Sequence, residues 1–324
     1  MFKDKLFLIL FISLLVSFCG CDRSNAQENK KKTSIVVTTV PLYDWAKSII
    51  GSASNDVDIT VLQDSGVDLH DYQPTAKDII IIGKADIFIF VGGQSDNWVP
   101  NVLSQVKNTK RKNINALSLV KDMMHKDCHS KCNHHHDHHH DHDLHTTPDE
   151  HIWLSLRFAK KVCDEIAHSL IHVYPNGKDI FIANLEKYNA KLTKLDTSFS
   201  QYVSNAKNKS VITADRFPFA HFFSDYGLTH FAAFEGCTAE TDASFQTIMY
   251  LSQKLKTLNL PTIYTLEGGG DKIAKRIIEM SKQDKTAIKK LNSMQNTPLD
   301  KFTKLGGYIE IMKSNIAALK ETIK

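Results

Sequence analysis

The sequence carries little net charge of either sign. Its formal charge is only +4 over 324 residues, and no cluster of basic residues is interleaved with aromatic side chains. Nucleic-acid binding needs such a cluster, because contacts to phosphate supply much of the affinity. We therefore expect no nucleic-acid partner.

Two motifs of hydrolytic enzymes are also missing. The chain contains neither an HExxH pair nor a GxSxG nucleophile elbow. A metallohydrolase could still be built from two isolated histidines and a carboxylate, because a catalytic zinc needs three protein ligands and an open water position. That reading is the weaker alternative, and we expect the protein not to be an enzyme.

The long apolar run near the N-terminus is too short for a membrane-spanning helix. "LFLILFISLLVSF" has thirteen residues and follows Lys3 and Lys5, as in the core of a signal peptide. Gly20 before Cys21 is similar to a bacterial lipobox, which predicts a lipid on Cys21; the alternative is cleavage near Ala26 without lipid. We predict a signal peptide over 1–21, a polar tether over 22–33, and an extracytoplasmic protein that is lipid-anchored or periplasmic.

Beyond the tether, predicted strands and helices alternate in two halves. The predicted strands cover 33–39, 57–62, 86–93 and 113–119 in the first half, and 209–214, 228–234, 261–266 and 286–291 in the second. Residues 179–207 contain no proline or glycine and predict one helix of roughly 40 Å.

This alternation predicts an α/β fold with two lobes, each built on a parallel-type sheet. The expected boundaries are 34–176 for the N-terminal lobe, 177–207 for the rigid linking helix and 208–324 for the C-terminal lobe. Ligands of parallel sheets lie at the carboxyl ends of strands, so a site is expected in the cleft between the lobes.

A histidine-rich loop covers residues 125–145, with ten histidines and four aspartates. Neutral imidazole is a preferred ligand of zinc, copper and nickel, so the loop should collect metal without holding it in one fixed geometry. Cys128 and Cys132 could form a disulfide or take part in that binding. Nine histidines are the predicted collectors: His129, His134, His135, His136, His138, His139, His140, His142 and His145.

His70 and His151 stand apart from this loop. "GVDLHDYQPTAKDI" places His70 between a strand and a helix, and "DEHIWLS" places His151 at the start of a helix. Both junctions should face the predicted cleft. A lone histidine at such a position is more often a cap or a solvated side chain, so the argument for a metal site depends on its surroundings.

Those surroundings resemble a known family. The two segments above, together with "ADRFPFAHFFSDYGL", "GCTAETDASFQT" and "LNSMQ", are similar to the zinc/manganese-type (cluster A-I) solute-binding proteins of ABC transporters, from about residue 34 onward. The histidine-rich loop is typical of the zinc type. The resemblance implies two βα lobes bridged by a rigid helix, one divalent cation between them, and His70 and His151 as ligands from the first lobe.

In the second lobe the sequence departs from that family. The position of the usual third ligand is Arg216, a permanent cation that cannot bind metal. Asp215, Glu240 or Glu235 could replace it, and the position of the fourth ligand corresponds to Asn292, with water as the alternative. Asp215 and Arg216 could equally form an ion pair within the lobe.

The resemblance implies a monomeric binding protein that captures Zn²⁺ with high affinity and delivers it to an ABC permease driven by a cytoplasmic ATPase. Manganese or iron is the alternative cargo, Mn²⁺ being favoured if oxygen ligands dominate. A metal-buffering surface lipoprotein or adhesin, in which the histidine-rich loop is the whole function, is the other alternative.

Overall fold

The computed structural model describes residues 32–124, 148–234 and 242–324. The predictions about the signal peptide, the lipid on Cys21, the tether up to residue 31, the histidine-rich loop and Glu240 lie outside these residues. No helix in the described ranges is long and apolar enough to cross a membrane.

The first lobe is built on a parallel four-stranded sheet in the order β2-β1-β3-β4. Its strands are β1 (Thr33–Val37), β2 (Val57–Val61), β3 (Ile87–Phe90) and β4 (Lys112–Asn115). Successive side chains alternate between the two faces: Ile35 and Val37 belong to one buried cluster, Val36 to another. Helices therefore cover both faces, as a parallel sheet requires.

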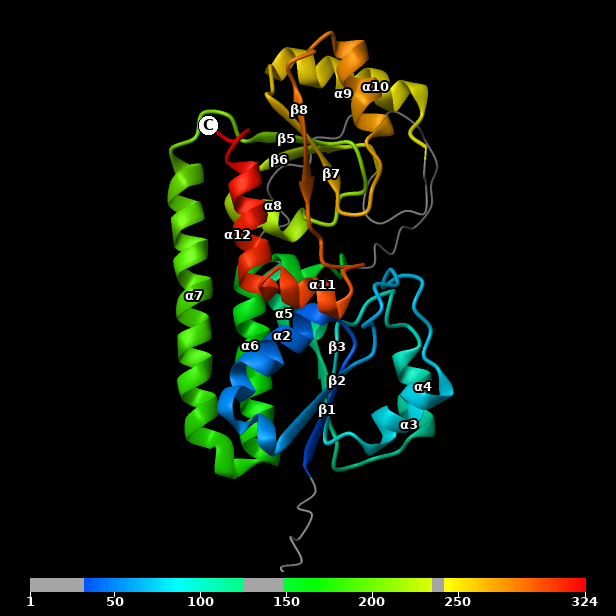
Figure 1. The fold of residues 1–324 in the computed structure, drawn as a ribbon, viewed down its shortest axis with the longest axis vertical. Coiled ribbons are helices and arrows are strands. Elements are labelled where there is room, and N and C mark those ends of the chain that lie inside the picture. Colours follow the sequence, from blue (N-terminus) through cyan, green and yellow to red (C-terminus); the bar gives the residue numbers. More distant parts are fainter. Residues whose placement is uncertain (1–31, 125–147, 235–241) are drawn as a thin grey trace, which may run out of the picture. The chain divides into compact units, whose positions relative to one another are not determined.

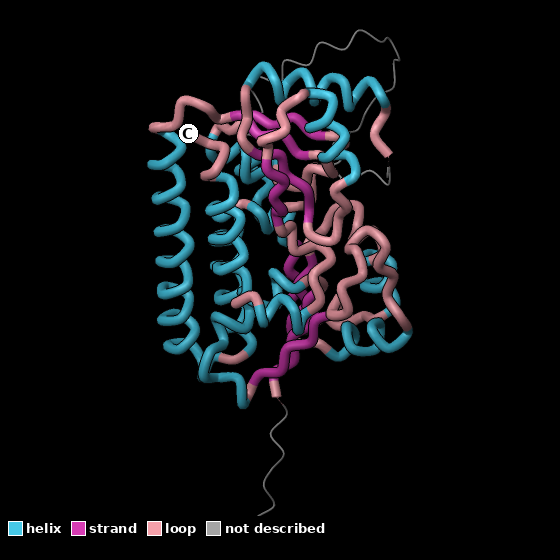
Figure 2. Tube along the Cα trace, turned by 45° about the horizontal axis from the view of Figure 1, so that its top comes forward, coloured by secondary structure: helices cyan, strands magenta, loops and turns pink. Residues whose placement is uncertain are grey.

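The helices of this lobe divide between the two faces. Residues of α2 (Val40–Ile50), α5 (Ala116–Met124) and α6 (Leu156–Val173) share the cluster of Ile35 and Val37, whereas α3 (Ala76–Lys84) and α4 (Val99–Gln105) pack on the other face. In Figure 2 the strands lie between helices.

The second lobe repeats this arrangement, with a parallel sheet in the order β6-β5-β7-β8. Its strands are β5 (Ser210–Thr213), β6 (Thr229–Ala232), β7 (Thr262–Leu266) and β8 (Ala287–Leu291). One face packs against α9 (Phe245–Leu258) and α10 (Lys272–Ser281), and the other against a cluster that includes α8 (Ala220–Tyr226). The predicted fold class of two parallel-sheet lobes is confirmed.

Two helices connect the lobes. The predicted linking helix is α7 (Lys178–Ser204). The second is α12 (Gly307–Leu319), which follows α11 (Leu299–Lys304) and lies beside α7 (Figure 1). At one end of α12, Tyr308 donates a hydrogen bond to the carbonyl of Trp153 in the first lobe (2.6 Å); near the other, the hydroxyl of Tyr264 in β7 donates to the carbonyl of Ala318 (2.8 Å).

Two local predictions need correction. The strand predicted over 113–119 ends at Asn115, and α5 begins at Ala116. The Asn115 side chain accepts a hydrogen bond from the backbone N–H of Ser118 (3.0 Å) and so caps the first turn of that helix. His151 precedes a short 3₁₀ helix, Ile152–Leu154, and α6 begins only after Ser155, whose hydroxyl caps it.

Candidate metal site

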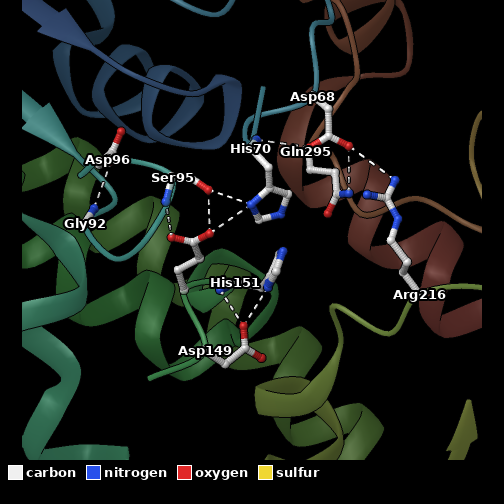
Figure 3. A network of polar contacts seen from close by, with 10 residues as sticks. Asp68, His70, Gly92, Ser95, Asp96, Asp149, His151, Arg216 and Gln295 are labelled. Atoms are coloured by element: carbon white, nitrogen blue, oxygen red, sulfur yellow. Dashed lines mark hydrogen bonds and ion pairs between the residues drawn. The ribbon is translucent and has the colours of Figure 1, made fainter. Parts of the chain in front are cut away.

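His70 lies on the loop between β2 and α3, where a network of polar side chains fixes its ring. Its backbone N–H donates to Asp68 Oδ1 (3.1 Å). Its Nδ1 lies 2.8 Å from the hydroxyl of Ser95, which follows β3, and 3.2 Å from Glu150 Oε1. The Ser95 hydroxyl and backbone N–H both donate to the Glu150 carboxylate (Figure 3).

This network determines which nitrogen of His70 carries the proton. The single hydroxyl hydrogen of Ser95 is donated to Glu150, so Ser95 can only accept from the ring. Burial alone would raise the pKa of Glu150, but hydrogen bonds from His70 and Ser95 outweigh it and hold that pKa below its usual value. Since both neighbours of Nδ1 are acceptors, the proton of neutral His70 is on Nδ1, and Nε2 keeps a free lone pair.

His151 is fixed in the same way. Its Nδ1 lies 2.6 Å from Asp149 Oδ1, which also accepts the backbone N–H of His151 at 3.0 Å. Burial would raise the pKa of Asp149, but the hydrogen bonds and charge of His151, with the charge of His221, lower it below its usual value. The ionised carboxylate therefore accepts the proton on Nδ1 and fixes the orientation of the His151 ring.

The two rings meet at the carboxyl end of the first sheet. Their centroids are 5.6 Å apart, and both rings point into one space (Figure 3). Carboxylates or hydroxyls behind the far ring nitrogen are typical of metal-binding histidines, because they set the tautomer and the orientation of the ring. The described residues contain no group of three or more His, Cys, Asp or Glu side chains placed to hold a metal ion, so this pair needs other donors.

Two residues of the second lobe form hydrogen bonds with Asp68, which lies in the first lobe two residues before His70. Asp68 Oδ2 accepts hydrogen bonds from Arg216 of the loop after β5 and from Gln295 Nε2 of the loop after β8, both at 3.3 Å. The guanidinium of Arg216 therefore pairs across the lobes, and the proposed ion pair between Asp215 and Arg216 is corrected to one between Asp68 and Arg216.

Asp215 and Asn292, also predicted from the second lobe, form hydrogen bonds within that lobe. The Asp215 carboxylate accepts the backbone N–H groups of Arg216 (2.8 Å) and Leu266 (3.1 Å). The Asn292 side-chain oxygen accepts the N–H of Met294 (2.8 Å) and the hydroxyl of Thr297 (3.3 Å). Their roles as metal ligands stay predictions.

Sequence reasoning missed the residues that hold the two histidines. Asp149 and Glu150 stand directly before His151 in the quoted segment "DEHIWLS", so an adjacent acidic pair was the available signal. Ser95 carried no such signal, because it meets Glu150 only through the fold, 55 positions away in the chain.

Two parallel-sheet lobes, with paired imidazoles at the carboxyl end of one sheet and the other lobe facing them, define a solute-binding protein of the metal-binding kind. The family model described as "Zinc-uptake complex component A periplasmic" matches residues 35–322. The chain therefore belongs to this family, which is a family of binding components rather than of enzymes.

Individual relatives agree with this assignment. The chain is 31% identical over 327 residues to the high-affinity zinc uptake system protein ZnuA of Bacillus subtilis (strain 168), covering 100% of this chain and 99% of that protein. It is 30% identical over 315 residues to the zinc-binding lipoprotein AdcA of Streptococcus pneumoniae (strain ATCC BAA-255 / R6), covering 95% of this chain but only 60% of that longer relative.

A solved structure has the same fold. The Zn(II)-bound ZnuA-like domain of Streptococcus pneumoniae AdcA superposes with a TM-score of 0.69 at 27% identity, covering 90% of this chain and 99% of that domain.

Proposed function

We propose that this protein captures Zn²⁺ between its lobes and delivers it to the permease of an ABC transporter powered by a cytoplasmic ATPase, without catalysing a reaction itself. The observation that carries the proposal is the state of His70. Its Nδ1 is fixed by Ser95 and Glu150, while its Nε2 is buried and has no hydrogen-bond partner among the described residues. A buried nitrogen lone pair without a partner is costly unless a ligand uses it.

Nitrogen donors favour zinc over the alternative cargoes. His70 and His151 each offer a neutral imidazole, which suits zinc, whereas manganese prefers oxygen-rich, octahedral surroundings. The zinc-binding relatives support the same cargo. We assign His70 and His151 as the ligands of the first lobe.

The segments outside the described residues have accessory roles in this proposal. The ten histidines of 125–145 collect metal and exchange it quickly. A lipid on Cys21 holds the monomeric protein at the outer surface of the cytoplasmic membrane, near its permease. Glu240 stays a predicted ligand.

The test is a calorimetric titration of Zn²⁺ and Mn²⁺ into the mature protein, the same protein lacking 125–145, and the deletion variant with His70→Ala. One tight zinc site should survive the deletion and disappear with His70→Ala. Loss of all tight binding on deletion would instead make the loop the whole function and refute transport from the cleft. Tight manganese with weak zinc would keep the site and change the cargo.

A further inference from the structure

The site contains a second buried polar atom of the same kind, and it comes from the other lobe. Within the part of the chain that the structure describes, neither Nε2 of His70 nor the side-chain oxygen of Gln295 has a hydrogen-bond partner. Gln295 is only 6% exposed and follows β8, whereas His70 follows β2. Two buried acceptors, one from each lobe, therefore lack a donor at the same site.

Asp68 determines how the amide of Gln295 is oriented. A carboxylate only accepts hydrogen bonds, so the amino group of Gln295 faces Asp68 Oδ2 (3.3 Å) and the oxygen must point away from it. Figure 3 shows this oxygen directed into the space beside the rings of His70 and His151. Neither this oxygen nor the lone pair of His70 can donate to the other, but a cation can satisfy both.

The loop that carries Gln295 is held from both lobes. Glu267, after β7, accepts the N–H groups of Ser293 (2.7 Å) and Met294 (2.9 Å). From the first lobe, the indole N–H of Trp153 donates to the carbonyl of Ser293 (2.7 Å). These bonds fix the backbone immediately before Gln295, so its amide is placed before any ligand binds.

We propose that Gln295 is the second lobe's ligand, its amide oxygen binding the divalent cation together with Nε2 of His70 and of His151. This inference rests on the proposed function. Asp68 holds the Gln295 amino group, and its other oxygen fixes the loop of His70, so one carboxylate positions a ligand from each lobe. Because an amide oxygen is neutral, it binds the ion more weakly than a carboxylate and favours its release to a transporter.

The experiment compares Gln295→Leu with Gln253→Leu in the full chain. Gln253 is exposed on α9, so Gln253→Leu is the same substitution at a position outside the site. Zinc affinity is measured by competition with a chelator strong enough to empty the weaker sites of the histidine-rich loop. Cobalt(II) spectra at one equivalent in the same buffer report the ligand set, and thermal unfolding of the metal-free proteins reports the fold.

Gln295→Leu should weaken zinc binding by at least about tenfold, the lower end of the effect seen even for partners of metal ligands, and change the cobalt spectrum. Metal-free Gln295→Leu should still fold: it loses the hydrogen bond from the amino group to Asp68, which keeps Arg216 as a donor, and it removes a buried oxygen that has no partner among the described residues. Gln253→Leu should bind zinc like the wild type, because surface substitutions away from a site have small effects. Wild-type zinc affinity and an unchanged spectrum in Gln295→Leu would overturn the assignment.

A Gln295→Glu variant covers the case in which leucine does not fold. The added carboxylate should tighten zinc binding if this position is a ligand, and unchanged affinity would refute it. His70→Ala separates the two proposals. If His70→Ala does not remove the tight site, the proposed function fails; if it does and Gln295 variants bind normally, only the role of Gln295 fails.

Discussion

Glu150→Gln should disable the proposed metal site without changing either histidine proposed as a ligand. Three donors converge on the Glu150 carboxylate: the N–H and hydroxyl of Ser95 and Nδ1 of His70. A glutamine offers one acceptor oxygen and one amino donor, so at least one of the three donors meets another donor. The ring of His70 can relieve this conflict by moving its proton to Nε2, where it blocks the lone pair that should bind zinc.

The expected loss of zinc affinity is about 10- to 100-fold, as for other partners behind a metal-binding histidine, which is about 1.4–2.7 kcal/mol of binding free energy. Replacing one buried acceptor should also lower the free energy of unfolding by about 1–3 kcal/mol. Zinc affinity is measured by chelator competition, and the ¹⁵N shifts of the His70 ring identify its tautomer.

Glu186→Gln on the exposed face of α7 is the matched control. It should change neither the zinc affinity nor the free energy of unfolding. A folded Glu150→Gln protein that binds zinc like wild type, with the proton of His70 still on Nδ1, would refute this account of how the site is prepared. Ser95→Ala provides a second variant of the same network and should weaken binding in the same direction.

Three further predictions concern residues around the site. Burial raises the pKa of Asp96 from its ordinary 3.8 to about 7. The contribution of this carboxyl to the free energy of unfolding is therefore fully present below pH 3.8, and about 4 kcal/mol of it is lost as pH rises through 7. In urea unfolding of the metal-free protein, the stability of Asp96→Asn relative to wild type should rise by about 2–3 kcal/mol between pH 5 and 8, and a difference that does not change with pH would contradict this. Arg216→Met should tighten zinc binding by removing a positive charge beside Asp68, at a cost of about 1 kcal/mol or less in stability; weaker binding in a titration would show that the pair supports the site. Trp153→Phe should lower the free energy of unfolding by about 1–2 kcal/mol, because it leaves the carbonyl of Ser293 without its donor. An unchanged free energy of unfolding in chemical denaturation would exclude this hydrogen bond as a stabilising contact.

The order of strands and helices could be predicted from the sequence, because it depends on patterns of neighbouring residues. Buried strands such as Ile87–Phe90 are short apolar runs, and Thr75, a typical N-cap residue, stands directly before α3 and accepts the N–H of Asp78. The end of β4 at Asn115 could not be predicted, because it depends on one side chain: Asn115 caps the helix that follows.

The candidate metal site could be predicted from the sequence only in part. His70 and His151 stand in distinctive segments of sequence, but their tautomers depend on Ser95 and Glu150, which meet across 55 positions. In the second lobe, the family resemblance suggested Asn292, whereas the side-chain oxygen of Gln295, three residues further on, is buried and has no hydrogen-bond partner among the described residues. Which of two nearby amides turns inward depends on the hydrogen bonds of the loop, and these are not visible in the sequence.

The return of α12 to the first lobe affects the order in which the protein can fold. Tyr308 packs edge-on against Trp45 of α2 at 5.3 Å between ring centroids, a contact between residues more than 250 positions apart. A chain synthesised from its N-terminus cannot complete the core around Trp45 until the segment with Tyr308 is available. Formation of the first lobe is therefore coupled to the arrival of the last helix, and long-range contacts of this kind slow folding. Until then an incomplete apolar surface stays open to chaperones and proteases.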